Sequence, residues 1–246
     1  MCGRYYVDEI VGKEIRELVQ LIGARDSEKR IQRSGLQEEG QRQGISSRTL
    51  GERRRASQNT QEFASEFPAE HHVSFQKIPV IGDVHPSEWA EIIYLNQESV
   101  EIRTMRWGFP GKDSGLIINA RAETVLERPL FRESVRYRRC IVPAGRYYEW
   151  NRQKEKVAFE RSDTPVFYMA GLYNLYQGEE RFVVITTEAN ESVRVVHDRM
   201  PLILEPYEVE LWLRDEAAAQ KLLNKVPATL HRIQEYEQLS LWGMEE

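Results

Sequence analysis

The chain has 246 residues, of which 41% are hydrophobic and 30% are charged. This length fits one ordinary domain or two small ones, and no stretch approaches the roughly 18 to 20 continuous apolar residues of a membrane span. A formal net charge of −5 argues against a general nucleic-acid binder. Arginine nevertheless dominates residues 103–146 and acid dominates residues 205–246, a pattern compatible with one basic face or with dispersed, solvated arginines.

The N-terminal sequence and the cysteine content indicate a reducing compartment. Residues 1–12 show no basic region followed by an apolar run, so they do not resemble a secretory signal. Cys2 and Cys140 are the only cysteines of the sequence, and we expect both to be reduced thiols in a cytoplasmic protein. Cys140 lies in an apolar segment, RRCIVP, and is expected to be a buried packing residue.

The first predicted element is an amphipathic helix from Asp8 to about Ile22, because its apolar residues recur at helical spacing. The character of the chain then changes. Residues 24–62 contain no aromatic residue, Val, Met or Cys and are rich in Arg, Gln, Glu and Ser, a composition that cannot form its own core. We therefore expect residues 24–76 to be a flexible or weakly structured insertion within a single domain that spans residues 1–246.

Strands dominate the sequence from Ile78 onward. Short apolar or alternating segments are separated by Gly, Pro and Asp, as in EIIYL, VEIRTMRWGF and RFVVITTEA. Helical segments are predicted near Glu123 to Leu126, Pro206 to Leu213 and Glu216 to Leu223. Many short strands without regular βαβ alternation favour an α+β fold, with a curved, mainly antiparallel β-sheet or barrel and flanking helices.

The most reactive group that the sequence offers is Cys2. Removal of Met1 would leave a first residue with an α-amine and a thiol on adjacent carbons. The amine is partly neutral at cellular pH and condenses with an aldehyde to an imine, on which the thiol closes to a five-membered thiazolidine. Ring-opened abasic sites in DNA carry such an aldehyde. Beside Cys2, Gly3 permits close backbone approach and Arg4 can bind a phosphate.

Five segments of the sequence resemble the motifs of a known family. They are MCGR at the start, RWGF (106–109), INARAET (118–124), RCIVPAGRYYEW (139–150) and HDRMPLIL (197–204). In this order they are similar to the motifs of the SRAP family, the SOS response-associated peptidase-like proteins that act as abasic-site sensors. The resemblance implies a single SRAP-like domain that binds single-stranded DNA and forms a covalent thiazolidine crosslink at an abasic site through its N-terminal cysteine.

The resemblance also implies four catalytic residues. Cys2 is the nucleophile, and Asn119 positions Cys2 and the opened sugar. Glu149 is a general acid or base, and His197 transfers protons during ring opening and imine formation; a carboxylic acid and an imidazole suit these steps. Structural alternatives stay open, with Asn119 as a turn residue, Glu149 as an ion-pair partner of an arginine and His197 as a structural histidine.

Candidate DNA contacts lie within or beside the same motifs. They are Arg4, Trp107, Arg121, Arg146, Met200 and Pro201. The three arginines are expected to contact phosphates, and the tryptophan either stacks on a base or belongs to the core. The methionine and the proline are expected to form an apolar lip that separates or turns bases. We expect neither a metal nor a cofactor, because no histidine is spaced with a cysteine or carboxylate cluster.

Three functions are compatible with these features. The first is covalent capture of abasic sites in single-stranded DNA during DNA repair and the SOS response, with AP-lyase and self-release activity. The second is a cysteine peptidase, including autoproteolysis of Met1, in which Cys2, His197 and either Asn119 or Glu149 form a triad. The third is a noncatalytic single-stranded DNA-binding protein. For the first we expect a cytoplasmic monomer, nucleoid-associated when bound to DNA, whose partner is abasic single-stranded DNA and not a membrane.

Overall fold

The computed structural model describes residues 3–42 and 79–234 of the chain. Contacts divide the chain into two units, one made of residues 1–23 with 77–246 and the other of residues 24–76. The long helix α1 (Glu9–Arg42) begins in the first unit and continues in the second. The strands and the other helices belong to the first unit, which also holds every candidate site residue.

Five strands of the first unit close into a barrel. They are β3 (Trp89–Asn96), β4 (Ser99–Trp107), β8 (Arg139–Ala144), β11 (Phe167–Tyr176) and β12 (Glu179–Glu188). They pair in the order β12-β4-β3-β8-β11, and β11 pairs again with β12. Within this ring β4 and β12 are parallel and the other pairings are antiparallel. Closure leaves these strands without an open sheet edge.

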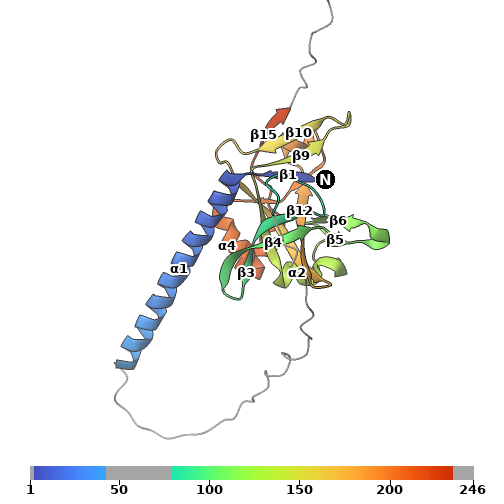
Figure 1. Ribbon diagram of the computed structural model, residues 1–246. Helices are drawn as coiled ribbons and strands as arrows, with labels where there is room; N and C mark the ends of the chain where they lie inside the picture. Colours follow the sequence, from blue (N-terminus) through green and yellow to red (C-terminus); the bar gives the residue numbers. More distant parts are fainter. Residues whose placement is uncertain (1–2, 43–78, 235–246) are drawn as a thin grey trace, which may run out of the picture. The chain divides into compact units, whose positions relative to one another are not determined.

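A second sheet packs against the barrel. Its strands, in spatial order, are β15 (His231–Gln234), β10 (Lys156–Glu160), β9 (Arg146–Trp150), β1 (Arg4–Val7) and β2 (Gly82–Val84). Figure 1 shows β1, β9 and β10 side by side above the barrel strands. One hydrophobic cluster contains Tyr5 and Tyr147 from this sheet together with Trp107 and Phe182 from the barrel, so the two sheets share a core.

Short strands extend the barrel on either side of β12. They are β7 (Asn119–Arg121) and β13 (Arg199–Pro201). Another short strand, β14 (Ile203–Leu204), pairs with β11. A separate two-stranded sheet is made of β5 (Phe109–Pro110) and β6 (Leu116–Ile117). Thr186 on β12 pairs with Arg121 on β7 and with Pro201 on β13. Two motif segments that are far apart in the sequence therefore flank one strand.

The remaining elements are helices. They are α2 (Pro129–Tyr137), α3 (Glu191–Arg194), α4 (Pro206–Arg214) and α5 (Glu216–Leu222), with a 3-10 turn at Lys112–Ser114. Helix α1 completely buries Val11, Ile15 and Ile22, which belong to the same hydrophobic cluster as Trp212 of α4. Within the described ranges, no helix has the length and apolar character needed to cross a membrane.

The predicted fold class is confirmed, because helices and strands are mixed and the main sheet closes into a barrel with flanking helices. The first predicted helix is also confirmed, but it continues to Arg42, well past Ile22. The predicted insertion starts within this helix, and its remaining residues, 43–76, lie outside the described residues. Its flexibility therefore stays a prediction.

The helix predicted near Glu123 to Leu126 is wrong. Residues 122–127 form turns, in which the Thr124 and Glu127 N–H groups donate to carbonyls three residues back at 3.2 and 3.1 Å. The helix of this region is α2, which starts later, at Pro129. A proline at the first turn suits a helix start because that position has no intrahelical partner for an N–H group.

Candidate functional site

Glu149 is a buried carboxyl group on β9. It is 2% exposed and lies in a run of three buried residues, Tyr147 to Glu149. Because side chains alternate along a strand, Glu149 shares the face of Tyr147, whose ring stacks on Phe159 with ring centroids 5.2 Å apart. The alternation therefore directs the carboxyl group of Glu149 toward the shared core and not toward the outer face of the sheet.

Burial raises the pKa of the Glu149 carboxyl above its usual range, because the charged form is poorly solvated there. A charged His197 opposes this shift, and the carboxylate of Asp198 adds to it. The loop that carries His197 thus lies within electrostatic range of Glu149. The sequence analysis proposed Glu149 as a general acid or base and His197 as a proton-transfer residue, and the fold places the two within this range.

The start of β1 lies beside Glu149. Strands β1 and β9 are antiparallel, and Arg4 is opposite Tyr148. The N-terminal end of β1 therefore meets the C-terminal end of β9, where Glu149 and Trp150 are located. Cys2, the predicted nucleophile, lies outside the described residues.

His197 is held in the loop between α3 and β13. Its backbone N–H donates to the Val193 carbonyl at 3.0 Å, and its Nδ1 accepts the backbone N–H of Arg199 at 2.9 Å. The Asp198 carboxylate also lies 3.1 Å from Nδ1, but this side chain is 87% exposed. The Arg199 carbonyl oxygen lies 3.3 Å from the same nitrogen, so Nδ1 faces one donor and two acceptors. These contacts are compatible with either neutral tautomer of the imidazole and hold the ring in place.

Asn119 is the first residue of β7 and is half-buried. Its strand runs parallel to β12, with Asn119 opposite Val184. The preceding carbonyl, that of Ile118, accepts the indole N–H of Trp107 at 3.0 Å and the Val184 N–H at 3.1 Å. Trp107 also packs on Tyr5 of β1, with ring centroids 5.1 Å apart. This chain of contacts connects the Asn119 strand with the N-terminal strand.

The structure corrects the base-stacking role considered for Trp107. The side chain is 0% exposed and stacks on Phe182 with ring centroids 6.1 Å apart. A base needs an exposed ring face, and both faces of this indole are within the core. Trp107 is therefore a packing residue that supports the strand of Asn119.

The apolar lip expected from Met200 and Pro201 is wrong for the same reason. Both residues are buried on β13, and the Met200 sulfur accepts the Asn190 N–H at 3.4 Å. Strand pairing with β12 places Met200 opposite Thr187 and Pro201 opposite Thr186, inside the fold. These side chains fix β13, and with it the adjacent His197 loop, and do not form a surface lip.

Trp150 is an exposed aromatic residue beside Glu149 that sequence reasoning did not single out. Its indole is 37% exposed, directly after Glu149, and the guanidinium of Arg4 lies over the ring at 5.3 Å. The sequence signal was present, because alternation along RYYEW places Trp150 on the face opposite to Glu149 and hence toward solvent. The exposed indole and the Arg4 guanidinium together suit a strand with both bases and phosphates.

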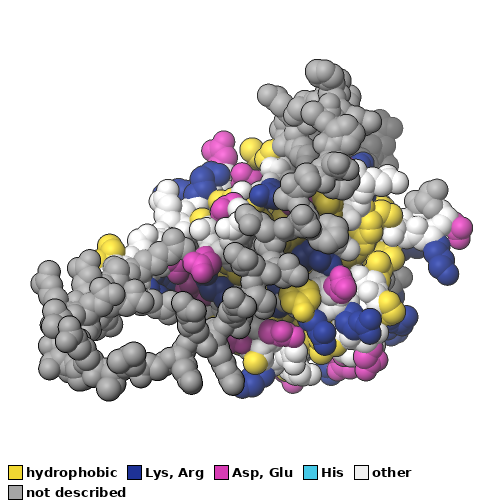
Figure 2. Space-filling view, turned by 90° about the horizontal axis from the view of Figure 1, so that it is seen from below, with side chains coloured by type: hydrophobic (Ala, Val, Ile, Leu, Met, Phe, Trp, Pro, Cys, Tyr) yellow, Lys and Arg dark blue, Asp and Glu magenta, His cyan; other side chains and the backbone are white. Residues whose placement is uncertain are grey.

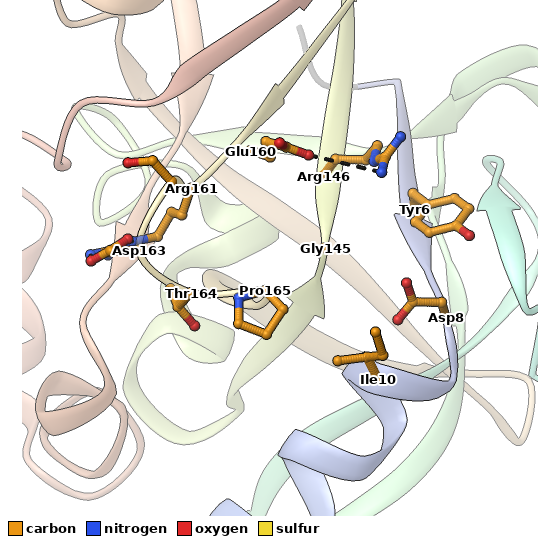
Figure 3. A pocket seen from close by; sticks show the side chains of 11 residues that line it. Tyr6, Asp8, Ile10, Gly145, Arg146, Glu160, Arg161, Asp163, Thr164 and Pro165 are labelled. Carbon is orange, nitrogen blue, oxygen red and sulfur yellow. Dashed lines mark hydrogen bonds and ion pairs between the residues drawn. The ribbon is translucent and has the colours of Figure 1, made fainter.

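Arg146 lies on the outer face of β9 and not on the face of Glu149. It lines a surface pocket of about 420 Å³ with Tyr6, Glu160 and Arg161 (Figure 3). Its guanidinium lies 5.0 Å from the Tyr6 ring centroid and 3.8 Å from Glu160, which is longer than a hydrogen bond. Arg161 pairs with Asp163 and Glu205 at 2.7 and 2.8 Å, so its charge is compensated.

Charge is mixed on the described surface. Arg121 on β7 is exposed, two residues after Asn119. On the face drawn in Figure 2, cationic and anionic side chains of the described residues are interspersed. Arginines of the arginine-rich region have carboxylate partners, among them Arg103 with Glu180 and Arg106 with Glu179, which favours dispersed arginines over one basic surface.

Cys140 and the remaining titratable groups add no second reactive centre to the described part of the chain. Cys140 is fully buried, as predicted, and burial raises the pKa of its thiol well above the usual range. The described ranges contain no group of three or more His, Cys, Asp or Glu side chains arranged to hold a metal ion.

Comparison with known proteins gives a consistent assignment. A curated protein of Bacillus subtilis named "Abasic site processing protein YoqW" is 34% identical over 170 residues, which cover 63% of this chain and 72% of that protein. "Abasic site processing protein YoaM" of the same organism is 32% identical over 159 residues, 58% of this chain and 70% of that protein. The Escherichia coli protein named "Abasic site processing protein YedK" is 27% identical over 152 residues, 57% of this chain and 68% of that protein.

Solved structures and a family model agree with these relatives. A crystal structure of a Bacteroides thetaiotaomicron protein matches with a TM-score of 0.55 and 27% identity, covering 63% of this chain and 78% of that chain. The family model described as SOS response associated peptidase (SRAP) matches residues 50–240, a range that begins after the MCGR segment. This match spans more than half of the chain, and the chain therefore belongs to the SRAP family.

Proposed function

We propose that this protein captures abasic sites in single-stranded DNA as a covalent thiazolidine formed by Cys2. The observation that carries the proposal is the placement of a buried carboxyl group, Glu149, beside the start of β1, within electrostatic range of His197. The names of the curated relatives, abasic site processing proteins, support the same substrate. An acid and an imidazole beside an aminothiol are the groups that this reaction needs.

The reach of the N-terminus is consistent with this chemistry. Cys2 precedes Arg4 by two residues, and two residues of chain span at most about 7 Å. Since Arg4 pairs with Tyr148, the residue before Glu149, two residues of chain are long enough for an N-terminal aminothiol to reach the Glu149 carboxyl. Removal of Met1 is part of the proposal, because thiazolidine closure needs the α-amine of Cys2.

Each proton in the reaction has a candidate donor. Opening of the sugar moves the proton of the C1′ hydroxyl to the ring oxygen, and Glu149, whose raised pKa retains the protonated form to higher pH, is the proposed donor to that oxygen. The α-amine of Cys2 then attacks C1′, and the aldehyde oxygen leaves as water with the two protons of the amine, for which His197 is the proposed relay. Finally the thiol sulfur bonds to the imine carbon, and its proton passes to the nitrogen.

An AP-lyase side reaction follows from the same intermediate. An imine at C1′ acidifies the C2′ proton, so a nearby base can remove it and expel the 3′ phosphate by β-elimination. Closure of the thiazolidine removes the imine and stops this path. We therefore propose that capture dominates over strand cleavage while the thiol of Cys2 is present.

A cysteine peptidase is the second candidate, favoured by the 3.1 Å distance between the Asp198 carboxylate and His197 Nδ1. In a triad the orienting carboxylate accepts the Nδ1 proton, and an unprotonated Nε2 takes the proton of the nucleophile. The Arg199 N–H also contacts Nδ1, at 2.9 Å, and a donor at this nitrogen opposes the Nδ1–H form that a triad needs. The peptidase is therefore the second candidate.

Substitution of Cys2 by serine separates these functions. Cys2→Ser keeps an α-amine, so an abasic oligonucleotide should still form an imine that borohydride reduction traps. It should lose the heat-stable band that the unmodified protein gives on a denaturing gel without a reductant. Cys140→Ala is the control, because its buried thiol should be dispensable for crosslinking.

Other outcomes would contradict the proposal. A heat-stable band that persists in Cys2→Ser would exclude the thiazolidine. Hydrolysis of a peptide substrate without any band on abasic DNA would favour the peptidase. Equal, non-covalent retention of intact and abasic strands would favour a noncatalytic binder.

A further inference from the structure

We propose that Asn190 is a positioning residue that holds the His197 loop, residues 195–198, against the sheet that carries Glu149. The consequence for catalysis rests on the proposed function, but the structural link can be measured without DNA. Asn190 lies between β12 and α3 and is the N-cap of that short helix. The His197 N–H donates to the Val193 carbonyl of α3 at 3.0 Å, so the place of the helix sets the place of the loop.

Both ends of the Asn190 amide are engaged. Its oxygen accepts the backbone N–H and the hydroxyl of Ser192 at 3.1 and 2.6 Å. Its nitrogen donates to the Pro227 and Ala228 carbonyls, each at 3.0 Å, and the Ser192 hydroxyl oxygen accepts the Leu230 N–H at 3.1 Å. Two donors at the oxygen and two carbonyls at the nitrogen assign the orientation of the amide, because the reverse would oppose N–H to N–H. We call these contacts of Asn190 and Ser192 with Pro227, Ala228 and Leu230 the clasp.

The clasped segment continues directly into the sheet of Glu149. It is followed by β15, which pairs with β10, and β10 pairs with β9. Val157 of β10 lies opposite Gln234 of β15 on one side and opposite Glu149 of β9 on the other. Leu230 and Val193 are both buried in the hydrophobic cluster that the two sheets share. The clasp therefore links α3 to the sheet of the candidate acid.

Other contacts hold the His197 loop to the barrel instead. The Asp198 carbonyl accepts the N–H of Ala189, the residue after β12, at 3.0 Å. Directly after the loop, the Arg199 guanidinium donates to both carboxylate oxygens of Glu123 at 2.7 and 2.9 Å. These contacts restrain the loop on its barrel side, and the clasp restrains it toward the second sheet. A displacement of about 1 Å between reacting groups can cost roughly 10²-fold in rate, so both restraints bear on catalysis.

The substitution Asn190→Asp tests the clasp. Aspartate keeps an oxygen for the Ser192 donors but loses both N–H donations, and its charge faces two carbonyls. We expect crosslinking at saturating abasic DNA to slow roughly 10- to 10²-fold, because His197 is misplaced. The affinity for an intact strand, measured by fluorescence anisotropy, should not change. Asn224→Asp is the matched control, because it removes an amide donation to the Gln220 carbonyl, at 3.4 Å, from α5.

A pair of substitutions separates positioning from a general loss of stability. If Asn190 acts through His197, Asn190→Asp should add no further loss of rate to His197→Gln. A further loss in the His197→Gln background would mean that Asn190 affects the rate by another route, and it would overturn the positioning role.

Hydrogen exchange measures the link without DNA. Loss of the clasp in Asn190→Asp should raise backbone exchange in residues 227–234 and, together with it, in residues 193–200. Faster exchange confined to residues 227–234, or no change in either segment, would overturn the positioning role. Asn224→Asp should match the unmodified protein in both segments.

The outcomes separate this inference from the proposed function. If the unmodified protein forms no crosslink, the proposed function fails, and hydrogen exchange still decides whether the clasp holds the His197 loop. Faster exchange in residues 193–200 with an unchanged crosslinking rate supports the positioning role and contradicts the relay role of His197. Should Asn190→Asp fail to fold, Ser192→Ala decides by the same measurements, because it removes the hydroxyl contacts with Asn190 and Leu230 and keeps the Asn190 amide.

Discussion

At the scale of single residues, the burial of Glu149 leads us to expect that replacing it by glutamine raises stability and lowers activity. Burial raises its pKa in the folded chain above the unfolded value, so the folded chain retains this proton to higher pH. The stability that this group contributes is complete below its unfolded pKa, near about 4.3, and is lost as the pH rises through the folded pKa. Glu149→Gln cannot ionise and should escape this loss.

We therefore expect Glu149→Gln to melt about 2 to 4 °C higher than the unmodified protein at pH 8, with no difference near pH 4. Its crosslinking rate should fall roughly 10²-fold, because the proton donor is lost. Melting curves and gel-based rates across this pH range test both effects. Glu188→Gln, an exposed carboxyl on β12, should change neither quantity. A lower melting temperature for Glu149→Gln at pH 8 would show that the ionised carboxylate is stabilising.

The motif resemblance indicated candidate segments but not which of their side chains reach the surface. Met105 and Trp107 flank Arg106, and the period of two along a strand places them on one buried face. The same alternation places Trp150 outside when Glu149 lies inside. Sequence alternation thus carried information about exposure that the motifs alone did not.

At the scale of secondary-structure elements, Arg139 joins the ends of two helices. This residue begins β8 and is 6% exposed. Its guanidinium donates to the Val135 and Arg136 carbonyls at the end of α2 and to the Trp212 and Leu213 carbonyls at the end of α4. The last carbonyls of a helix lack intrahelical partners and carry partial negative charge, so a buried cation stabilises them.

Arg139→Met should reduce the free energy of unfolding by about 3 to 5 kcal/mol, because it leaves several buried carbonyl groups without a donor. Urea denaturation measures the change. Arg138→Gln, which removes the 3.4 Å pair with Glu133, should cost less than about 1 kcal/mol. Similar values for the two variants would mean that water replaces the guanidinium at the helix ends.

At the scale of the whole molecule, long-range pairing explains what the sequence did not predict. Strand β1 spans Arg4–Val7 and pairs with β2 and β9, which are distant in the sequence. The barrel closes where Arg106 of β4 meets Arg181 of β12 in parallel. Local propensity predicted an α+β fold with a curved sheet, but such non-local contacts have no local signal, so the partners of each strand stayed undetermined.

The charge of the whole chain makes a prediction about DNA binding. The formal net charge is −5, and the candidate phosphate contacts are three dispersed arginines, Arg4, Arg121 and Arg146. Each phosphate neutralised on a single strand contributes roughly −0.7 to the slope of log K against log salt, so three contacts predict a slope of about −2.

Arg121→Gln should make the slope shallower by roughly 0.7. Arg103→Gln should leave it unchanged, because Arg103 is paired with Glu180 at 2.7 Å, more closely than Arg4 is paired with Asp83, at 3.4 Å. Fluorescence anisotropy with an intact oligonucleotide from 50 to 300 mM salt, on the order of the range over which such slopes are resolved, measures these values. A slope near zero would assign the affinity to base stacking on Trp150, and a slope several times steeper would require a basic surface beyond these arginines.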